Sequence, residues 1–391
     1  MDLLTQDLWA IVLAGLPLKS TITSKLVCKQ WKSLVESPFF RDLFLSHHQN
    51  SYSSSWSFMC RGCETETMAH YGSDSWNLKR SLGSYISSFL SEKFENRQGR
   101  VVAYTDVGLI LIHVVTNQSF YVANPVSRQC VEILPRDGPR ETFWILGIAT
   151  RTQDGVVLGY KVVLLKTNFS FLVYSSETGL WSLETVRFPF SFVSQEFNNP
   201  ISLNGQLHWL AHNLEHQDFV VSVDFYAATG TGPDRCRATP FPDLDKNPKF
   251  KRVCSTSQGF LMYMNIVSEQ NKEDKLCLWR LKCGEWQLVS EISPAFIEAN
   301  MYYIPLGINP IDAKTVYFWS GDRNHQCLLS VNLHNGEFVL HNELERTSEG
   351  RVLSSVDGPR DMEYVLESHF SSFVLPQWLH CFPSAVRNVQ N

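Results

Sequence analysis

A recurring two-strand unit constrains the fold of this 391-residue chain more than any other feature. Each copy consists of an apolar strand, a turn that contains glycine, and a second strand opened by an aromatic residue. Three copies place that aromatic residue at Trp181, Trp286 and Phe338. The interval from Trp286 to Phe338 is 52 residues, and the preceding interval is about twice as long. The chain therefore repeats with a period of about 50 residues.

Steps of the same length locate further copies of the unit. They reach Trp76, Gln129 and Cys236, so that six units fit between about residues 57 and 345. Beyond residue 57 the sequence has strand-like runs and little helical periodicity. A second marker, a strand opened by glycine, recurs in phase at Gly108, Gly155, Gly205 and Gly259, with Ala313-Lys314 at the last expected position. Each unit thus offers about four strands.

Four-stranded units of this length predict the blades of a β-propeller of kelch type. One blade cannot bury both of its faces, whereas a closed ring of about six blades can, and closure leaves only short edges. The expected fold class is therefore α+β multidomain, with a small helical domain before a mostly-β propeller. The diagnostic paired glycines of kelch repeats are single here, and an irregular pair of β-sandwiches with coincidental aromatic spacing is the alternative.

Residues 1–45 are a different kind of sequence and predict three short helices. Leu4 and Leu8 begin a helical apolar stripe, Pro17 follows the first helix, and Pro38 stops the third. About forty residues are near the size below which a core rarely sustains itself, and the apolar surface is too wide to face inward entirely. This favours docking to a partner protein; packing against the rest of the chain is the alternative.

The same residues resemble a known domain. Leu16–Ser20, Leu26–Val35 and Ser37–Phe40 match, in order and spacing, the F-box pattern of Leu-Pro-x-Lys-Ser, Val-Cys-Lys-x-Trp-x-x-Leu and Pro-x-Phe. The resemblance implies binding to Skp1 and, through it, to a cullin–RING ubiquitin ligase. Two positions depart from the pattern, because Leu4-Thr5 replaces an opening Leu-Pro and Ile11 an acidic residue. The Skp1 contacts implied by the resemblance are Leu4, Leu8, Leu16, Pro17, Val27, Cys28 and Trp31.

The β region also resembles a known domain. Residues 46–57 are polar and serine-rich and predict a linker. Beyond them, five segments are similar to the F-box-associated domain of plant F-box proteins: Asn124–Gln129, Gly159–Val163, Val173–Trp181, Leu203–Leu210 and Leu276–Leu281. The resemblance covers residues ~100–345 and implies a substrate-binding domain. Together with the repeat, it predicts a substrate-binding propeller over residues 58–345. Residues 346–391 are then a closing segment and tail.

Charge and composition exclude several classes of protein. The chain has 34 Lys and Arg against 39 Asp and Glu, a net charge of −5, and a non-specific nucleic-acid binder would need a basic excess. The best apolar runs, such as Leu109–Val115, are far shorter than the ~20 residues of a membrane span. No secretory signal is visible, and ten scattered cysteines predict reduced thiols. We therefore expect no nucleic acid, no membrane, and a location in the cytoplasm and/or nucleus.

The sequence carries no strong signature of catalysis or metal binding. His208, His212 and His216 would form a ligand row on a helix, but the strand predicted there removes that geometry. Cys60 and Cys63 provide only half of a structural zinc site. A phosphate loop, a dinucleotide fingerprint and a nucleophile elbow are all absent from the sequence. We expect no catalytic residues, no metal, no cofactor and no enzymatic activity.

Aromatic residues gather in the connections between the units. Equivalent connections of a propeller emerge on the same side, so exposed rings there would form a surface for a client protein. The alternative is that the rings fill gaps between blades. The candidate substrate-binding residues are Phe143, Trp144, Phe190, Phe192, Tyr302 and Tyr303.

Together these features predict the substrate-recognition adaptor of an SCF (Skp1–cullin–F-box) ubiquitin ligase, which directs an unidentified client protein to ubiquitination and proteasomal degradation. One alternative is a Skp1-linked carbohydrate or small-molecule receptor, which would need an aromatic-floored pocket with converging polar groups. Another is a degenerate F-box protein that acts outside SCF complexes. An enzyme on a propeller would instead need carboxylates or metal ligands at the central channel.

Overall fold

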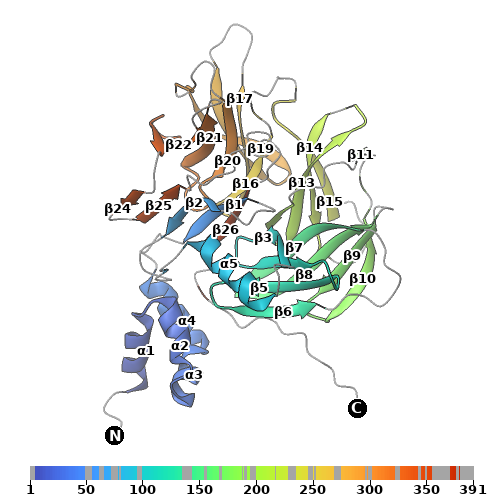
Figure 1. The fold of residues 1–391 in the computed structure, drawn as a ribbon. Helices are drawn as coiled ribbons and strands as arrows, with labels where there is room; N and C mark the ends of the chain where they lie inside the picture. The colour runs from blue at the N-terminus through green and yellow to red at the C-terminus, as the bar shows by residue number, and fades with distance from the viewer. Residues whose placement is uncertain are drawn as a thin grey trace.

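The computed structural model consists of a helical domain attached to a ring of β-sheets (Figure 1). It describes residues 5–48, 55–60, 66–71, 78, 81–94, 99–133, 143–153, 156–166, 170–186, 188, 192–193, 200–215, 217–227, 235–244, 250, 252–267, 274–295, 297, 302–321, 326–341, 345–347, 350–354, 370–375 and 378.

The N-terminal domain contains four helices: α1 (Gln6–Ala14), α2 (Leu18–Ser24), α3 (Lys29–Val35) and α4 (Pro38–His47). Three were predicted, so the helix count was wrong. Pro38 does follow the end of α3, but it also occupies the first turn of α4, where a proline lacks only a hydrogen bond that no helix would supply. The Ser37 hydroxyl caps α4 by accepting from the backbone N–H of Phe40 at 3.2 Å.

Six sheets form the ring, counted over the described strands, and each is a blade. Blade 2 is the meander β3 (Gly99–Tyr104), β4 (Ile110–Val114), β5 (Ser119–Asn124) and β6 (Gln129–Ile133). Blade 3 is β7 (Phe143–Gln153), β8 (Val156–Lys166), β9 (Ser170–Ser175) and β10 (Leu180–Thr185). Blade 4 is β11 (Phe192–Val193), β12 (Ile201–Leu203), β13 (Gln206–Asn213), β14 (Asp218–Asp224) and β15 (Cys236–Pro240).

The remaining blades complete the circle. Blade 5 is β16 (Cys254–Ser257), β17 (Phe260–Val267), β18 (Lys275–Lys282) and β19 (Glu285–Ile292). Blade 6 is β20 (Tyr302–Ile308), β21 (Thr315–Gly321), β22 (Gln326–Asn332) and β23 (Phe338–His341). Blade 1 joins β1 (Trp56–Cys60) and β2 (Glu66–Tyr71) to β24 (Glu345–Thr347), β25 (Gly350–Ser354) and β26 (Phe370–Val374).

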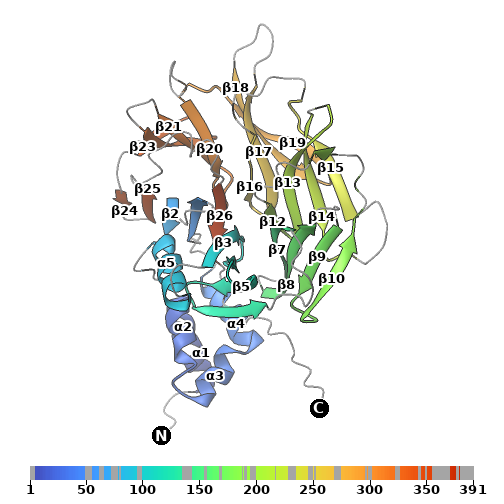
Figure 2. The ribbon, with the colours of Figure 1, turned by 45° about the vertical axis from the view of Figure 1, so that its right-hand side comes forward.

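Blade 1 closes the ring by pairing the two ends of the β region. Strand β26 pairs antiparallel with β1, with Trp56 opposite Val374 and Cys60 opposite Phe370. The innermost strands then lie next to one another in the cyclic order β26, β3, β7, β12, β16, β20 and back to β26. Figure 2 shows the sheets around their common centre. The predicted propeller of about six blades is confirmed.

Each blade buries its faces against its neighbours. A separate apolar cluster fills each of the five interfaces from blade 2 round to blade 1, as where Phe171 of blade 3 packs near Trp209 of blade 4. The inner strands also bulge where blades approach closely. At the bulge in β20, Gly307 has φ +156° and a Cβ there would come within 2.7 Å of the Phe58 ring of blade 1. Only glycine fits this approach.

The repeated hairpins predicted from the aromatic spacing are the two outer strands of a blade. Gly179, Gly284 and Gly336 lie in the turns of β9–β10, β18–β19 and β22–β23 with φ of +70°, +85° and +73°. These left-handed positions favour glycine, which is why the pattern was visible in the sequence. The Trp76 unit differs, because the described part of residues 56–94 consists of β1, β2 and a helix, and Trp76 itself lies outside the described residues.

The helix of that first unit, α5 (Leu82–Lys93), was not predicted. The Ser81 hydroxyl caps it by accepting from the backbone N–H of Ser84 at 3.1 Å. Its buried side chains belong to a sixth cluster, which spans the interface of blades 1 and 2 and continues into the N-terminal domain. This cluster joins α5, the ring and the helical domain in one core. The predicted linker, residues 46–57, is also shorter than expected, because α4 runs to His47 and β1 starts at Trp56.

Candidate functional site

The N-terminal domain exposes an apolar surface on the side of α1 and of the turn between α2 and α3. Leu8, Ile11 and Val12 of α1 are 45%, 56% and 53% exposed, and Leu26 and Val27 are 86% and 65% exposed. We call these five residues the helical apolar face. Monomeric proteins rarely group so many large apolar side chains in water without a partner.

The opposite side of the same helices is buried. Leu13, Leu18, Leu34 and Phe40 are each at most 5% exposed, and all belong to the core cluster that includes α5. The helices are therefore amphipathic toward their own chain, and the helical apolar face stays exposed, as does Phe39 of α4 at 59%. The alternative interpretation of the sequence was that the apolar surface packs against the rest of the chain. This holds for the buried side and not for the helical apolar face.

The seven predicted Skp1 contacts differ in their exposure to solvent. Leu8, Val27 and Cys28 are exposed, whereas Leu16, Pro17 and Trp31 are half-buried, and Leu4 lies outside the described residues. Trp31 packs on Trp9 with the ring centroids 5.0 Å apart. The Cys28 sulfur caps α3 by accepting from the Trp31 backbone N–H at 3.4 Å.

Three residues of the helical apolar face were absent from the predicted set. Ile11 and Val12 follow Leu8 at helical spacing, and Leu26 precedes Val27 in the turn. The signal for Ile11 was present in the sequence, where it replaces an acidic residue of the F-box pattern and thereby enlarges the apolar surface. The Skp1-binding role of the seven residues in the predicted set stays a prediction.

Contacts with the ring hold the N-terminal domain in place. Trp378, which is 6% exposed, packs on Phe40 and Phe44 of α4 with ring centroids 6.0 Å and 5.1 Å apart. The Lys19 ammonium lies 5.7 Å from the ring centroid of Tyr85 in α5. The domain is thus bound to the propeller on the side away from the helical apolar face.

The predicted aromatic client surface lies at the start of inner or neighbouring strands. Phe143 and Trp144 begin β7, Phe192 begins β11, and Tyr302 begins β20. All four residues lie at the end of the ring where one blade is connected to the next. The structure does not describe their side chains. Phe190 lies outside the described residues. Tyr303 is half-buried, with its ring centroid 6.5 Å from that of Phe250.

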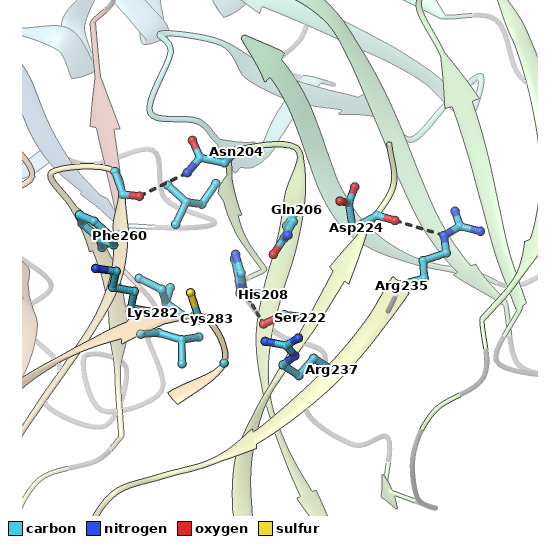
Figure 3. A pocket seen from close by; sticks show the side chains of 15 residues that line it. Asn204, Gln206, His208, Ser222, Asp224, Arg235, Arg237, Phe260, Lys282 and Cys283 are labelled. Atoms are coloured by element: carbon cyan, nitrogen blue, oxygen red, sulfur yellow. Dashed lines mark hydrogen bonds between the residues drawn. The ribbon is translucent and has the colours of Figure 1, made fainter. Parts of the chain in front are cut away.

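A polar pocket of about 320 Å³ opens between blades 4 and 5 (Figure 3). Blade 4 contributes side chains from β13, β14 and β15, and blade 5 contributes the turns that follow β16 and β18. The charged and polar lining residues are Asn204, Gln206, His208, Ser222, Asp224, Arg235, Arg237, Lys282 and Cys283. We call it the blade 4–5 pocket.

Its floor is a neutral histidine. The His208 Nδ1 lies 2.7 Å from the Ser222 hydroxyl oxygen, and burial lowers the pKa of His208 from 6.5 to about 4. The ring is therefore uncharged at neutral pH. His208 and His212 lie on strand β13, as predicted, and His216 lies outside the described residues. Over the described residues, no group of three or more His, Cys, Asp and Glu side chains is placed to hold a metal.

A small cavity lies between the inner strands of the described part of the ring. This cavity of about 20 Å³ lies among inner strands of five blades, and the hydroxyl oxygens of Thr256 and Ser372 are 3.3 Å apart across it. Asp106 lines this space, and burial raises the pKa of its carboxyl to about 6, against a smaller lowering by a backbone hydrogen bond. A cavity of this size holds about one water molecule, so it offers no room for a substrate.

Comparison with known proteins matches both parts of the chain. Residues 1–43 match the F-box domain, and residues 54–384 match the family described as "F-box protein At3g26010-like, beta-propeller". F-box protein At3g28330 of Arabidopsis thaliana is 68% identical over 395 residues, which cover 100% of this chain and 98% of that protein. F-box protein At1g49990 of the same plant is 32% identical, with 95% and 96% of the two chains covered.

F-box protein At3g26010 of Arabidopsis thaliana is 33% identical over 373 residues, which cover 92% of this chain and 81% of that protein. The descriptions name a β-propeller, and the kelch type inferred from the repeat stays a prediction. Among the described helices, none is both long and apolar enough to cross a membrane.

Proposed function

The chain belongs to the F-box proteins whose second domain is a β-propeller, and we propose that it is the substrate-recognition adaptor of an SCF ubiquitin ligase. In this role the F-box binds a Skp1-like protein, and through it a cullin–RING ligase. The propeller binds a client protein and presents it for ubiquitination and proteasomal degradation.

The observation that carries the proposal is the helical apolar face. Leu8, Ile11, Val12, Leu26 and Val27 are exposed, while the other side of the same helices is buried against α5 and the C-terminal Trp378. A second subunit can therefore cover the face without displacing any part of the described chain.

The adaptor itself needs no covalent chemistry. Its contribution is proximity, because a client held on the propeller lies near the ubiquitin donor carried elsewhere in the complex. The contacts of α4 and α5 with blades 1 and 2 support this role, because they fix the propeller relative to the F-box. A client bound to the propeller is then held in place relative to the ligase, and its lysines explore a smaller volume.

Binding to a purified Skp1-like protein tests the first half of the proposal. Ile11→Asp and Val27→Asp each place a carboxylate on the helical apolar face, and burying it should weaken binding by ~2 kcal/mol or more, about 30-fold. Leu183→Asp is the matched control, because Leu183 is 54% exposed on the outer strand β10, away from the F-box. Wild-type affinity in both F-box variants would rule out this docking face.

Purification from native tissue with the proteasome inhibited tests the second half. The tagged chain should recover a Skp1-like protein, a cullin and a client whose level rises when the proteasome is blocked. If the chain recovers a client but neither Skp1 nor a cullin, it acts outside SCF complexes.

A further inference from the structure

We propose that the blade 4–5 pocket binds a compact anionic group, a phosphate or a carboxylate, carried by a side chain of the client. The anion site stands on the pocket alone, whereas its assignment to a client rests on the proposed adaptor function. Figure 3 shows Lys282 and Cys283 on one side of the pocket, Asp224 and Arg235 on the other, and Arg237 beside Ser222 between them.

Two cations of the pocket have no anionic partner in the described part of the chain. Arg237 lies on β15 of blade 4 and Lys282 ends β18 of blade 5, and both are exposed and form none of the ion pairs found among those residues. They line the same pocket from different blades. The Arg237 guanidinium lies next to Gly284 in the turn after β18, so this side chain reaches across from blade 4 to blade 5.

The pocket holds two further charged side chains. The Asp224 carboxylate accepts from the backbone N–H groups of Tyr226 and Ala227 at 2.7 Å and 2.9 Å and keeps its negative charge. The buried Arg235 pairs with Glu184 of blade 3 and donates to the Asp224 carbonyl oxygen at 3.1 Å. With Arg235 paired, the two positive charges of Arg237 and Lys282 exceed the one negative charge of Asp224, so the pocket carries a net positive charge.

The remaining polar groups suit an oxyanion. Arg237, Lys282 and the Gln206 amide supply N–H donors on the wall, and the neutral His208–Ser222 pair adds polarity at the floor without adding charge. Guanidinium and ammonium groups form the strongest hydrogen bonds with phosphate and carboxylate. The donors come from both blades, so the pocket exists only when blades 4 and 5 pack together.

Size and shape restrict the ligand further. A volume of about 320 Å³ is at the lower end for ligand pockets and suits one side chain or a small anion. Phe260 is the only Phe, Trp or Tyr among the described lining residues, and the Arg280 guanidinium lies 4.7 Å from its ring centroid. One face of that ring is therefore occupied, which disfavours the aromatic-floored pocket that the carbohydrate-receptor alternative requires.

Protection of Cys283 from alkylation tests the anion site. Cys283 is exposed at the pocket, and Cys28 is an exposed internal control in the F-box. We expect O-phosphoserine, or glutamate if the site takes carboxylates, to slow alkylation of Cys283 but not of Cys28, as followed by peptide mass spectrometry of the full chain. N-acetylserine amide and N-acetylglutamine amide, which carry neither a phosphate nor a carboxylate, should give no protection.

Substitutions identify the cations that bind the probe. Arg237→Gln and Lys282→Gln should each weaken protection about tenfold or more, whereas Lys314→Gln, an exposed lysine in the turn between β20 and β21, should not. Unchanged melting temperatures would show that the variants are folded. Absence of protection by every anionic probe, or full protection in both pocket variants, would overturn the proposal.

Two further comparisons separate the parts of the proposal. Inorganic phosphate that protects as well as O-phosphoserine would support the anion site but overturn its assignment to a client side chain. Ile11→Asp should leave Cys283 protection unchanged, and Arg237→Gln should leave Skp1 binding unchanged. Failure of the anion site and failure of the adaptor function therefore give different results.

Discussion

Replacing Trp378 should detach the F-box from the propeller. The Trp378 side chain is 6% exposed and lies between Phe40 and Phe44 of α4 and the core of blades 1 and 2. Truncation of a buried tryptophan to alanine costs about 3–5 kcal/mol, which includes the loss of the two ring contacts. At roughly 2 °C per kcal/mol for a chain of this size, Trp378→Ala should lower the melting temperature by about 6–10 °C.

The mode of unfolding tests the reasoning more sharply than the temperature. In the wild type one core includes α1–α5 and the first two blades, so we expect one cooperative transition by circular dichroism and by limited proteolysis within the helices. Trp378→Ala should split this into an early helical transition and a later β transition. Trp286→Ala, which removes a half-buried ring of β19 that stacks on Phe241, is the matched control and should destabilise without splitting. A single transition in Trp378→Ala at the wild-type midpoint would refute the shared core.

The remaining predictions concern the ring and can be read from urea unfolding. Gly307→Ala drives a methyl group into Phe58 at the ring closure, so it should cost several kcal/mol, and a loss under about 0.5 kcal/mol would contradict the close approach. Glu184→Gln leaves the buried Arg235 without its anion and should cost about 3 kcal/mol, unless the guanidinium reaches water. The unfolded chain protonates His208 near pH 6.5 but the folded chain only near pH 4, so stability should fall as pH drops across that window, by up to about 3 kcal/mol, and His208→Gln should abolish this part of the pH dependence.

The parts of the fold visible in the sequence are those set by local chemistry. The turns at Gly179, Gly284 and Gly336 need a left-handed backbone, so glycine recurs there and marks each outer hairpin. Helix α5 had such a signal as well. Ser81 precedes apolar residues at helical spacing from Leu82 to Leu90, but the strand-rich context concealed it.

The missed parts depend on residues that are distant along the chain. Pairing of Trp56 with Val374 joins segments more than three hundred residues apart, and nothing local in either strand identifies its partner. The blade 4–5 pocket also depends on distant residues, because Arg237 and Lys282 line one pocket only after blades 4 and 5 have packed. The client surface proposed from the aromatic residues stays a prediction. Of its six residues, Tyr303 is the one whose side chain the structure describes, and it is half-buried beside Phe250.

Hydrogen–deuterium exchange of the intact chain, with and without a purified Skp1-like protein, tests the central claim most directly. The account predicts slower exchange in α1 and around Leu26 and Val27 on binding, with α4, α5 and the blades unchanged, because only the helical apolar face becomes covered. Protection confined to the propeller, or no protection anywhere at saturating Skp1-like protein, would contradict it.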